Sequence, residues 1–314
     1  MSAMQALNTL MVFNESGDAR QLAGLLTKGG EGEIHAVLDT PRALVKLYHP
    51  HIVQTRGAQL RDKIACMVSQ KQHFTSTTLG WPQFSVVDAK GNWLGYAMRR
   101  IEGHSMFSMA NPALFEKQFP TLNRLDISLM MQSLVQQVQQ LHSQGVMIGD
   151  YNLRNFMCHP ATRRVGLIDC DSYQLTNPQH FPCLVGTPEF SPPEHQQQAY
   201  GHLTRTLASE AFSLAVILFK CLMRGRHPYD QVGGGTPVSN MQSGLFPYAN
   251  EQGVPPGQWL GLWHKLPLYV RELFKQTFGL GANHPAHRPT LDQWQHAFKQ
   301  YVTDLRQGTL SPDI

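Results

Sequence analysis

The stretch from Val146 to Gln174 decides how the rest of this 314-residue chain is interpreted. It runs Val-Met-Ile-Gly-Asp-Tyr-Asn-Leu-Arg-Asn-Phe-Met, then a short turn, then Gly-Leu-Ile-Asp-Cys-Asp-Ser-Tyr-Gln. The two apolar runs predict two short strands. Pro160 and Thr162 interrupt the pattern between them, which predicts the turn of a hairpin.

Polar side chains stand at the edges of these two strands. Asp150 and Asn155 belong to the first half of the stretch and Asp169 to the second. The predicted hairpin would bring Asn155 and Asp169 together. Two carboxylates and an amide oxygen held close suit a hard cation such as Mg²⁺, or Mn²⁺, which shares its oxygen ligands with substrate phosphates. The stretch therefore predicts a site where a divalent cation meets a phosphorylated ligand.

The composition is that of a globular protein, with 42% hydrophobic and 15% charged residues. A net charge of +4 without a basic run gives no indication of nucleic-acid binding. The five cysteines form no Cys-x-x-Cys pair, residues 1–14 lack the basic cluster of a signal peptide, and the longest apolar run, 211–223, is too short to span a bilayer. We therefore expect a cytoplasmic protein without nucleic-acid or membrane partners.

The pattern of the chain changes from strands to helices near residue 100. Residues 21–100 predict a sheet with one helix, and residues 101–306 are mainly helical. The predicted helices are 54–70, 124–143, 208–223, 266–278 and 290–305. We predict an α+β fold of two lobes, with residues 1–20 as a lead-in to the first strand and 307–314 as a frayed tail.

A glycine-rich turn and a lysine in the first lobe point to phosphate binding. Gly29, Gly30 and Gly32 lie between two predicted strands, where glycines let backbone N–H groups approach a polyphosphate. Lys46 lies in an otherwise apolar strand, so it must reach a cleft or pair with an acid. Asp62, the only acid of helix 54–70, is its candidate partner. An ordinary hairpin turn and a surface lysine are the alternatives.

Taken in order, these motifs resemble the protein kinase fold over residues 20–305. The resemblance is to divergent bacterial eukaryotic-like Ser/Thr kinases with Gly-Asp-x-Asn-x-x-Asn and Ile-Asp-x-Asp-Ser motifs, some linked to helix-hairpin-helix or tellurite-resistance-type gene neighbourhoods. It implies an antiparallel sheet with one helix in the N-terminal lobe and a helical C-terminal lobe. It also implies ATP and Mg²⁺ as cofactors and a protein of unknown identity as substrate or partner.

On the nucleotide side, the resemblance assigns the glycines and Lys46 to the phosphates, with Thr27 in place of the first glycine. Met98 stands at the gatekeeper position. The backbone of three residues would then face adenine: Arg99, Arg100 and Ile101.

On the catalytic side, Asp150 matches the catalytic aspartate, and Asn155 and Asp169 match the metal-binding residues. Three further residues match structural positions of the family. Glu194, near the end of the activation segment, would pair with Arg288, and Glu210 would brace the catalytic loop.

Departures from the family pattern leave two functions open. Ile148 and Gly149 replace the usual His-Arg, so no arginine beside Asp150 awaits a phosphorylated activation segment. Asn152 replaces the lysine that steadies the γ-phosphate, and Asp171 replaces a glycine. An amide carries no charge, so Asn152 would stabilise the transition state less. The chain is then either an active Ser/Thr protein kinase, able to autophosphorylate, or a nucleotide-binding pseudokinase that acts as a scaffold for a partner.

Overall fold

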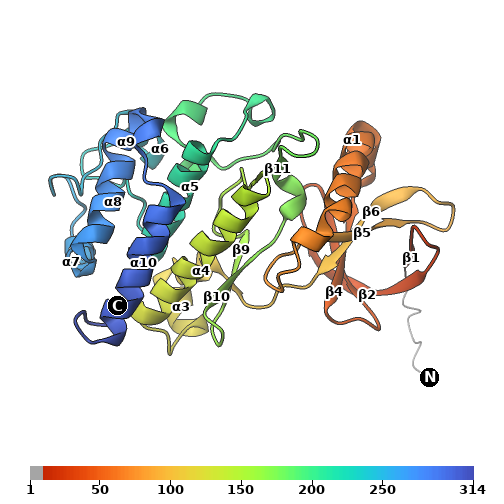
Figure 1. Cartoon of the computed structure of the whole chain (residues 1–314), viewed down its shortest axis with the longest axis horizontal. Helices are drawn as coiled ribbons and strands as arrows, with labels where there is room; N and C mark the ends of the chain where they lie inside the picture. Colours follow the sequence, from red (N-terminus) through yellow and green to blue (C-terminus); the bar gives the residue numbers. More distant parts are fainter. Residues whose placement is uncertain (1–9) are drawn as a thin grey trace, which may run out of the picture. The chain divides into compact units, whose positions relative to one another are not determined.

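The computed structural model describes residues 10–314, and the chain divides into two compact units. Unit 1 is Met1–Ile101 and unit 2 is Glu102–Ile314. Unit 1 consists mainly of strands and unit 2 mainly of helices, so the predicted α+β class is confirmed (Figure 1). The first nine residues of the predicted lead-in, 1–20, lie outside the described part of the chain.

The strands of unit 1 form a closed antiparallel barrel in the order β1-β2-β3-β4-β6-β5. Their bounds are β1 Met11–Asn14, β2 Ala19–Lys28, β3 Gly32–Val37, β4 Ala43–Tyr48, β5 Pro82–Val87 and β6 Trp93–Arg99. β1 closes the barrel because it pairs with both β2 and β5. β1 lies inside the predicted lead-in, because a run of four residues is too short to show a strand pattern.

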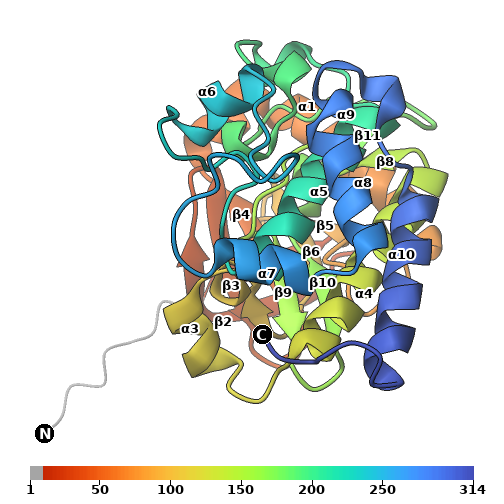
Figure 2. The same ribbon diagram turned by 90° about the vertical axis from the view of Figure 1, so that its left-hand side faces the viewer.

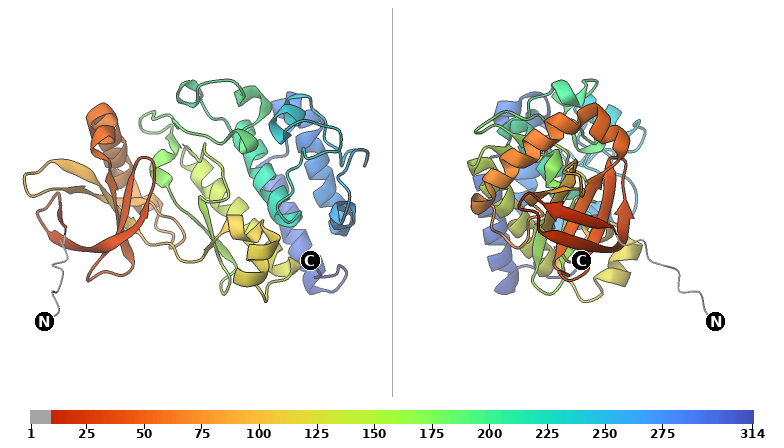
Figure 3. Two further views of the ribbon diagram at one scale, coloured as in Figure 1. Left: turned by 180° about the vertical axis from the view of Figure 1, so that it is seen from behind. Right: turned by 90° about the vertical axis from the view of Figure 1, so that its right-hand side faces the viewer.

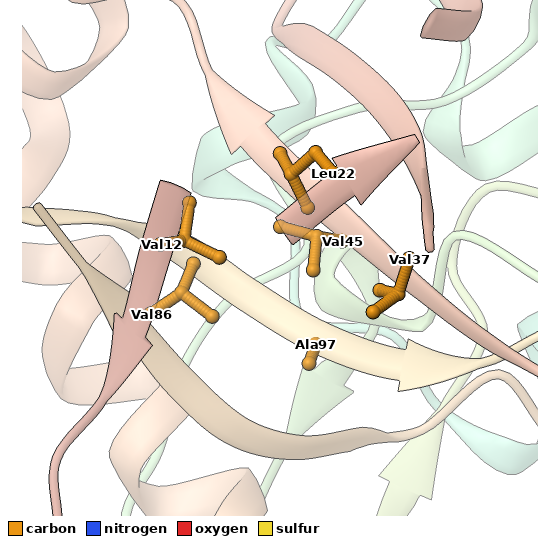
Figure 4. Close-up of a cluster of buried hydrophobic side chains, with 6 residues drawn as sticks. All are labelled: Val12, Leu22, Val37, Val45, Val86 and Ala97. Atoms are coloured by element: carbon orange, nitrogen blue, oxygen red, sulfur yellow. The ribbon is translucent and has the colours of Figure 1, made fainter. Parts of the chain in front are cut away.

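The barrel is filled by aliphatic side chains that alternate along the strands. Figure 4 shows this cluster: Val12, Leu22, Val37, Val45, Val86 and Ala97. Successive side chains of a strand point to opposite faces, so Lys46 and Tyr48 lie on the face away from Val45. Helix α1 (Pro50–Ser69) packs against β5 and β6 (Figure 3, right). It begins four residues before the predicted start, with Pro50 in its first turn.

Two long helices form the centre of unit 2. Helix α4 (Arg124–Ser143) begins with a capping box between Asn123 and Asp126. Helix α5 (Leu207–Leu222) is buried on nearly every side, as its continuous apolar sequence predicts. Figure 2 shows α8 (Leu268–Phe278) and α10 (Leu291–Arg306) beside them, and α10 packs against α4.

The other elements of unit 2 are short. Helices are α2 (Met106–Met109), α3 (Pro112–Gln118), α6 (Pro237–Gln242), α7 (Trp259–Lys265) and α9 (Leu280–Asn283). Strands β9 (Phe156–His159) and β10 (Arg164–Leu167) form the predicted hairpin, and β7 (His104–Ser105) pairs with β9. Strands β8 (Val146–Met147) and β11 (Gln174–Leu175) pair with each other.

The prediction of a frayed tail at 307–314 is wrong. The amide of Arg124 donates to the carbonyl of Pro312 at 2.9 Å, and its Nε donates to the carbonyl of Asp313 at 3.1 Å. Arg124 is only 2% exposed, so its guanidinium needs acceptors inside the fold. The tail supplies them, and it is thereby fixed at the start of α4.

Candidate active site

The carboxylate of Glu210 on α5 holds residues 148–155 of unit 2, which are the predicted catalytic loop and are called the catalytic loop below. Glu210 is 1% exposed and accepts hydrogen bonds from the amides of Ile148 and Gly149 at 2.7 and 2.9 Å. Tyr151 Oη donates to the same carboxylate at 3.1 Å, and His142 Nε2 lies 3.2 Å from it. Glu210 therefore lies behind the loop, where the sequence analysis expected it.

Burial keeps Tyr151, a hydrogen-bond partner of Glu210, protonated. Burial, and next the negative charge of Glu210, raise the pKa of Tyr151 well above its ordinary value. Tyr151 thus remains a neutral donor, and the carboxylate of Glu210 has a full set of donors. A buried network with every group satisfied gives a loop with one geometry.

Asp150 is half-buried, and the residues around it hold both of its carboxylate oxygens. Thr187 Oγ1 donates to Oδ1 at 2.8 Å. On the other side, Asn152 Nδ2 and Asn155 Nδ2 donate to Oδ2 at 3.3 and 3.4 Å. Asn155 Nδ2 also donates to the backbone carbonyl of Asp150 at 3.1 Å. The carboxylate is therefore oriented from the catalytic loop and from the activation segment, which we define as residues 170–194.

Thr187 is a site residue that sequence reasoning missed. The sequence analysis did not assign it a role at the site, although it stands in the run Gly186-Thr187-Pro188 before Pro193 and Glu194. The run itself could have indicated a site residue, because it places a hydroxyl between a glycine and a proline in the segment that follows Asp169. Its contact with Asp150 could not be read from spacing, because 37 residues separate the two.

The hairpin of β9 and β10 brings Asn155 and Asp169 to the same end of the two strands. Phe156 pairs with Leu167, and the amide of Ile168 donates to the carbonyl of Asn155 at 3.0 Å. Asp169 then adopts a left-handed conformation, with φ of 58°. This unusual backbone turns the chain sharply, and strain of this kind is typical of functional loops.

The donor set at this end of the hairpin suits a hard cation. Asn155 uses its amide nitrogen towards Asp150, which leaves the amide oxygen as the ligand atom. Asp169 contributes a carboxylate, and both ligands are oxygens, as Mg²⁺ prefers. Residues 10–314 contain no group of three His, Cys, Asp or Glu side chains that could hold a metal ion. A cation here would therefore share its coordination with phosphate oxygens and water.

The predicted ion pair between Glu194 and Arg288 is present. Arg288 donates through both terminal nitrogens to the two carboxylate oxygens of Glu194, each at 2.7 Å. Arg288 also donates to the carbonyls of Ala208 and Gly281, so its buried guanidinium is well satisfied. A bidentate pair of this kind fixes the end of the activation segment to the core of unit 2.

Lys46 lies in unit 1, on the face of the barrel opposite its core. It is 6% exposed, and its Nζ lies 5.4 Å from the centre of the Tyr48 ring. A buried ammonium needs polar or π partners, which excludes the alternative of a surface lysine.

The glycine hairpin between β2 and β3 is tight and closed on itself. The amide of Gly29 donates to the carbonyl of Gly32 at 2.8 Å. A Cβ at Gly32 would lie 2.3 Å from the carbonyl oxygen of Leu47, whereas a Cβ at Gly30 would meet nothing within 4 Å. Gly32 is therefore required by the barrel itself, Gly29 uses its amide to close the turn, and Gly30 is the position with open space around it. The carboxylate of Glu31 is neutralised by Arg56 at 2.8 Å.

Two of the predicted nucleotide contacts need correction. The amide of Arg100 donates to the carbonyl of Arg42 at 2.8 Å, so it is used in unit 1 and not offered to adenine. Asp62 is exposed and makes no hydrogen bond or ion pair with residues 10–314, because the buried face of α1 carries Lys63 instead. Met98 is buried on β6, and Arg99 and Ile101 follow it.

Comparison with known proteins gives this site its class. Residues 87–298, about two thirds of the chain, match the protein kinase domain. The chain belongs to the protein kinase domain family, which confirms the predicted fold.

The relatives that it matches are longer than the chain. Two of them, each named protein kinase YegI, come from Escherichia coli strains K12 and O157:H7 and are 27% and 28% identical over 315 and 313 residues. Each alignment covers 96% of this chain but 48% or 47% of the relative. The chain thus spans about half the length of the curated relatives it matches. Within residues 10–314, we find no helix with the length and hydrophobicity needed to cross a membrane.

Proposed function

We propose that this chain transfers the γ-phosphoryl group of ATP to a serine or threonine hydroxyl of a protein. The observation that carries the proposal is the hydrogen bond of 2.8 Å between Thr187 Oγ1 and Asp150 Oδ1. It supports a role for Asp150 as the acceptor of an aliphatic hydroxyl, because Thr187 presents to it the same group that a substrate would present.

Each site residue then has a stated task. Asp150 accepts the hydrogen bond of the substrate hydroxyl and aligns its oxygen for in-line attack. Asn155 and Asp169 would hold Mg²⁺, or Mn²⁺, which neutralises charge on the phosphates when bound. Lys46 would orient the α- and β-phosphates, and the amide of Gly30 would donate to them. Most of the catalysis is positioning and charge neutralisation.

Activation through a phosphate beside Asp150 is not part of the proposal. Ile148 donates its amide to Glu210, and Gly149 has no side chain, so neither residue can bind a phosphorylated activation segment. We propose that the catalytic loop is in its working geometry without that modification. We also propose that the chain acts in the cytoplasm, where cysteine thiols stay reduced. We also retain the narrower proposal that it belongs with the divergent bacterial kinases with Gly-Asp-x-Asn-x-x-Asn motifs.

The state of Asn152 favours a second candidate, a pseudokinase that binds nucleotide and shapes a partner surface. Asn152 Oδ1 accepts from the amide of Arg154 at 2.8 Å, and its Nδ2 donates to Asp150 at 3.3 Å. Both ends of the amide are thus used inside the loop. Residue 152 supplies no positive charge to the γ-phosphate, which favours slow or absent transfer.

Incubation with Mg²⁺ and ATP, followed by intact mass measurement, separates the two functions. If the chain is a kinase, its own mass or that of an offered protein rises by about 80 Da for each phosphate transferred. The Asp150→Ala variant should produce no such increase. ATP binding by calorimetry without phosphate on any protein would favour the pseudokinase. Arg306→Met, an exposed change on α10, is the control for handling and should behave as wild type.

A further inference from the structure

Arg205 lies just before α5 and is buried inside unit 2, with 3% of its surface exposed. Its backbone is fixed by the side chain of Gln174. Gln174 Oε1 accepts from the amide of Arg205 at 2.7 Å, and Gln174 Nε2 donates to its carbonyl at 3.0 Å. Gln174 pairs with Met147 on β8, the strand that leads into the catalytic loop. Arg205 is therefore anchored next to the start of that loop.

The guanidinium of Arg205 joins two segments that meet at Asp150. Its Nη2 donates to the carbonyl of Val185 at 3.0 Å, and its Nε donates to the carbonyl of Gly149 at 3.4 Å. Gly149 precedes Asp150 directly, and Val185 lies two residues before Thr187, which donates to Asp150. One side chain thus fixes the activation segment relative to the catalytic loop on both sides of the carboxylate.

Gly149 cannot supply such a contact itself. It has φ of +73°, and a Cβ there would lie 2.7 Å from both Cβ and Sγ of Cys183. The same Cβ would lie 3.4 Å from Nε of Arg205. Any side chain at position 149 is therefore excluded by the packing, and the guanidinium beside this position comes from Arg205.

Stability alone does not explain a buried arginine at this place. Its hydrogen-bond acceptors are neutral carbonyls, it stacks on the Tyr200 ring at 5.4 Å, and within residues 10–314 it forms no ion pair with a carboxylate. Nη1 is buried without a hydrogen-bond partner among those residues. Burial, and next the charge of Arg205, lower the pKa of His195, so this neighbour stays neutral. A buried charge with so few partners is costly, and an apolar side chain of similar size would fill the space at lower cost.

We propose that Arg205 is a positioning residue that clamps the activation segment to the catalytic loop without any phosphate, so that the enzyme is constitutively assembled around Asp150. The catalytic part of this inference rests on the proposed kinase function. The clamp itself concerns only unit 2 and can be tested without activity.

The test compares wild type, Arg205→Met, Arg205→Lys and the surface control Arg306→Met, all treated with a protein phosphatase and shown by mass to carry no phosphate. Amide hydrogen exchange over residues 181–187 should be faster in Arg205→Met by about 10-fold or more, because the Val185 contact is lost. Its thermal midpoint should not fall, since a buried charge has been replaced by an apolar side chain. A purely structural residue would lower that midpoint.

The kinetic arm measures kcat and KM for ATP separately. We expect kcat of Arg205→Met to fall about 10-fold to 100-fold, as for loss of charged hydrogen bonds, with KM for ATP changed less than about 2-fold. The kcat of Arg205→Lys should lie between those of wild type and Arg205→Met, because an ammonium can reach one carbonyl but cannot span both as the planar guanidinium does. Arg306→Met should match wild type in all measurements.

If amide exchange over residues 181–187 is unchanged in Arg205→Met, the clamp is wrong. If exchange is faster but kcat is unchanged, the clamp exists but Arg205 has no role in catalysis. Wild-type activity that disappears on dephosphorylation would also overturn that role. If phosphate-free and untreated wild type both transfer nothing, the proposed function fails. The exchange experiment then still decides the clamp, in favour if exchange is faster and against if it is unchanged.

Discussion

The catalytic loop of unit 2 and the glycine hairpin of unit 1 are held in opposite ways. Buried groups fix the loop, above all Glu210 at 1% exposure. The side chains of the hairpin are held by surface ion pairs, which are Lys28 with Glu33 and Arg56 with Glu31. The side chain of Lys28 is 63% exposed. Buried networks give one geometry, whereas exposed ion pairs contribute about 0–1 kcal/mol. We therefore expect the loop to be assembled before ATP arrives and the hairpin to adapt to the phosphates.

Removing the buried carboxylate should have the largest effect on stability. Glu210→Ala leaves the amides of Ile148 and Gly149 and the hydroxyl of Tyr151 buried without an acceptor, at a cost of about 3–5 kcal/mol in the free energy of unfolding. Urea unfolding measures this loss. Glu272→Ala, at an exposed carboxylate on α8, should change it by less than about 0.5 kcal/mol. A loss below about 1 kcal/mol for Glu210→Ala would contradict the assigned network.

Two glycines of the hairpin should respond differently to alanine. Gly32→Ala places a Cβ 2.3 Å from the Leu47 carbonyl and should cost about 1–3 kcal/mol through displaced backbone. Gly30→Ala meets open space and should stay within about 0.5 kcal/mol. Thermal unfolding of the two variants makes the comparison. Equal losses would show that the hairpin is more closely packed than the structure indicates.

Buried His227 makes the stability of unit 2 sensitive to acid. Its Nε2 lies 2.8 Å from the carbonyl of Glu189, and burial lowers the pKa of His227 to about 4 from an ordinary value of 6.5. The unfolded chain binds the proton first, so this contribution is complete above about pH 6.5 and falls as the pH drops towards 4. At pH 5, wild type should lose about 2 kcal/mol more than His227→Gln, relative to pH 7. Urea unfolding at both pH values measures the difference, and equal losses would contradict a neutral buried His227.

Asp62→Asn should have the smallest effect. Asp62 is exposed and makes no polar contact with residues 10–314, so kcat/KM should change less than about 2-fold and stability less than about 0.5 kcal/mol. Steady-state kinetics and thermal unfolding test this. A tenfold loss of kcat/KM would restore Asp62 as the partner of Lys46.

The parts of the site that are formed by short, continuous segments could be predicted from the hydrophobic pattern of those segments. The hairpin that joins Asn155 to Asp169 followed from two apolar runs and a turn, α4 followed from its helical periodicity, and α5 followed from its continuous apolar run. Lys46 was expected to reach a cleft or pair with an acid because its strand is otherwise apolar, and its side chain is buried in the structure. In each case the signal lies within about twenty residues.

Contacts between distant segments were not predictable from the residues alone. Thr187 reaches Asp150 over 37 residues, and Arg205 reaches Gly149 over 56. The tail at 307–314 was expected to fray because nothing in its sequence shows that Arg124, 189 residues before Asp313, needs its carbonyls. Asp62 was chosen as the only acid of its helix, but which side of α1 is buried depends on packing against the barrel.

The central claim is that Asp169, placed by the hairpin, holds the cation for phosphoryl transfer. Transfer of ³²P from ATP should be measured for wild type and Asp169→Asn with Mg²⁺, and again after chelation. We predict that wild type transfers phosphate only with the cation present and that Asp169→Asn loses about 100-fold to 1,000-fold in rate. Equal transfer by Asp169→Asn and wild type would contradict the account.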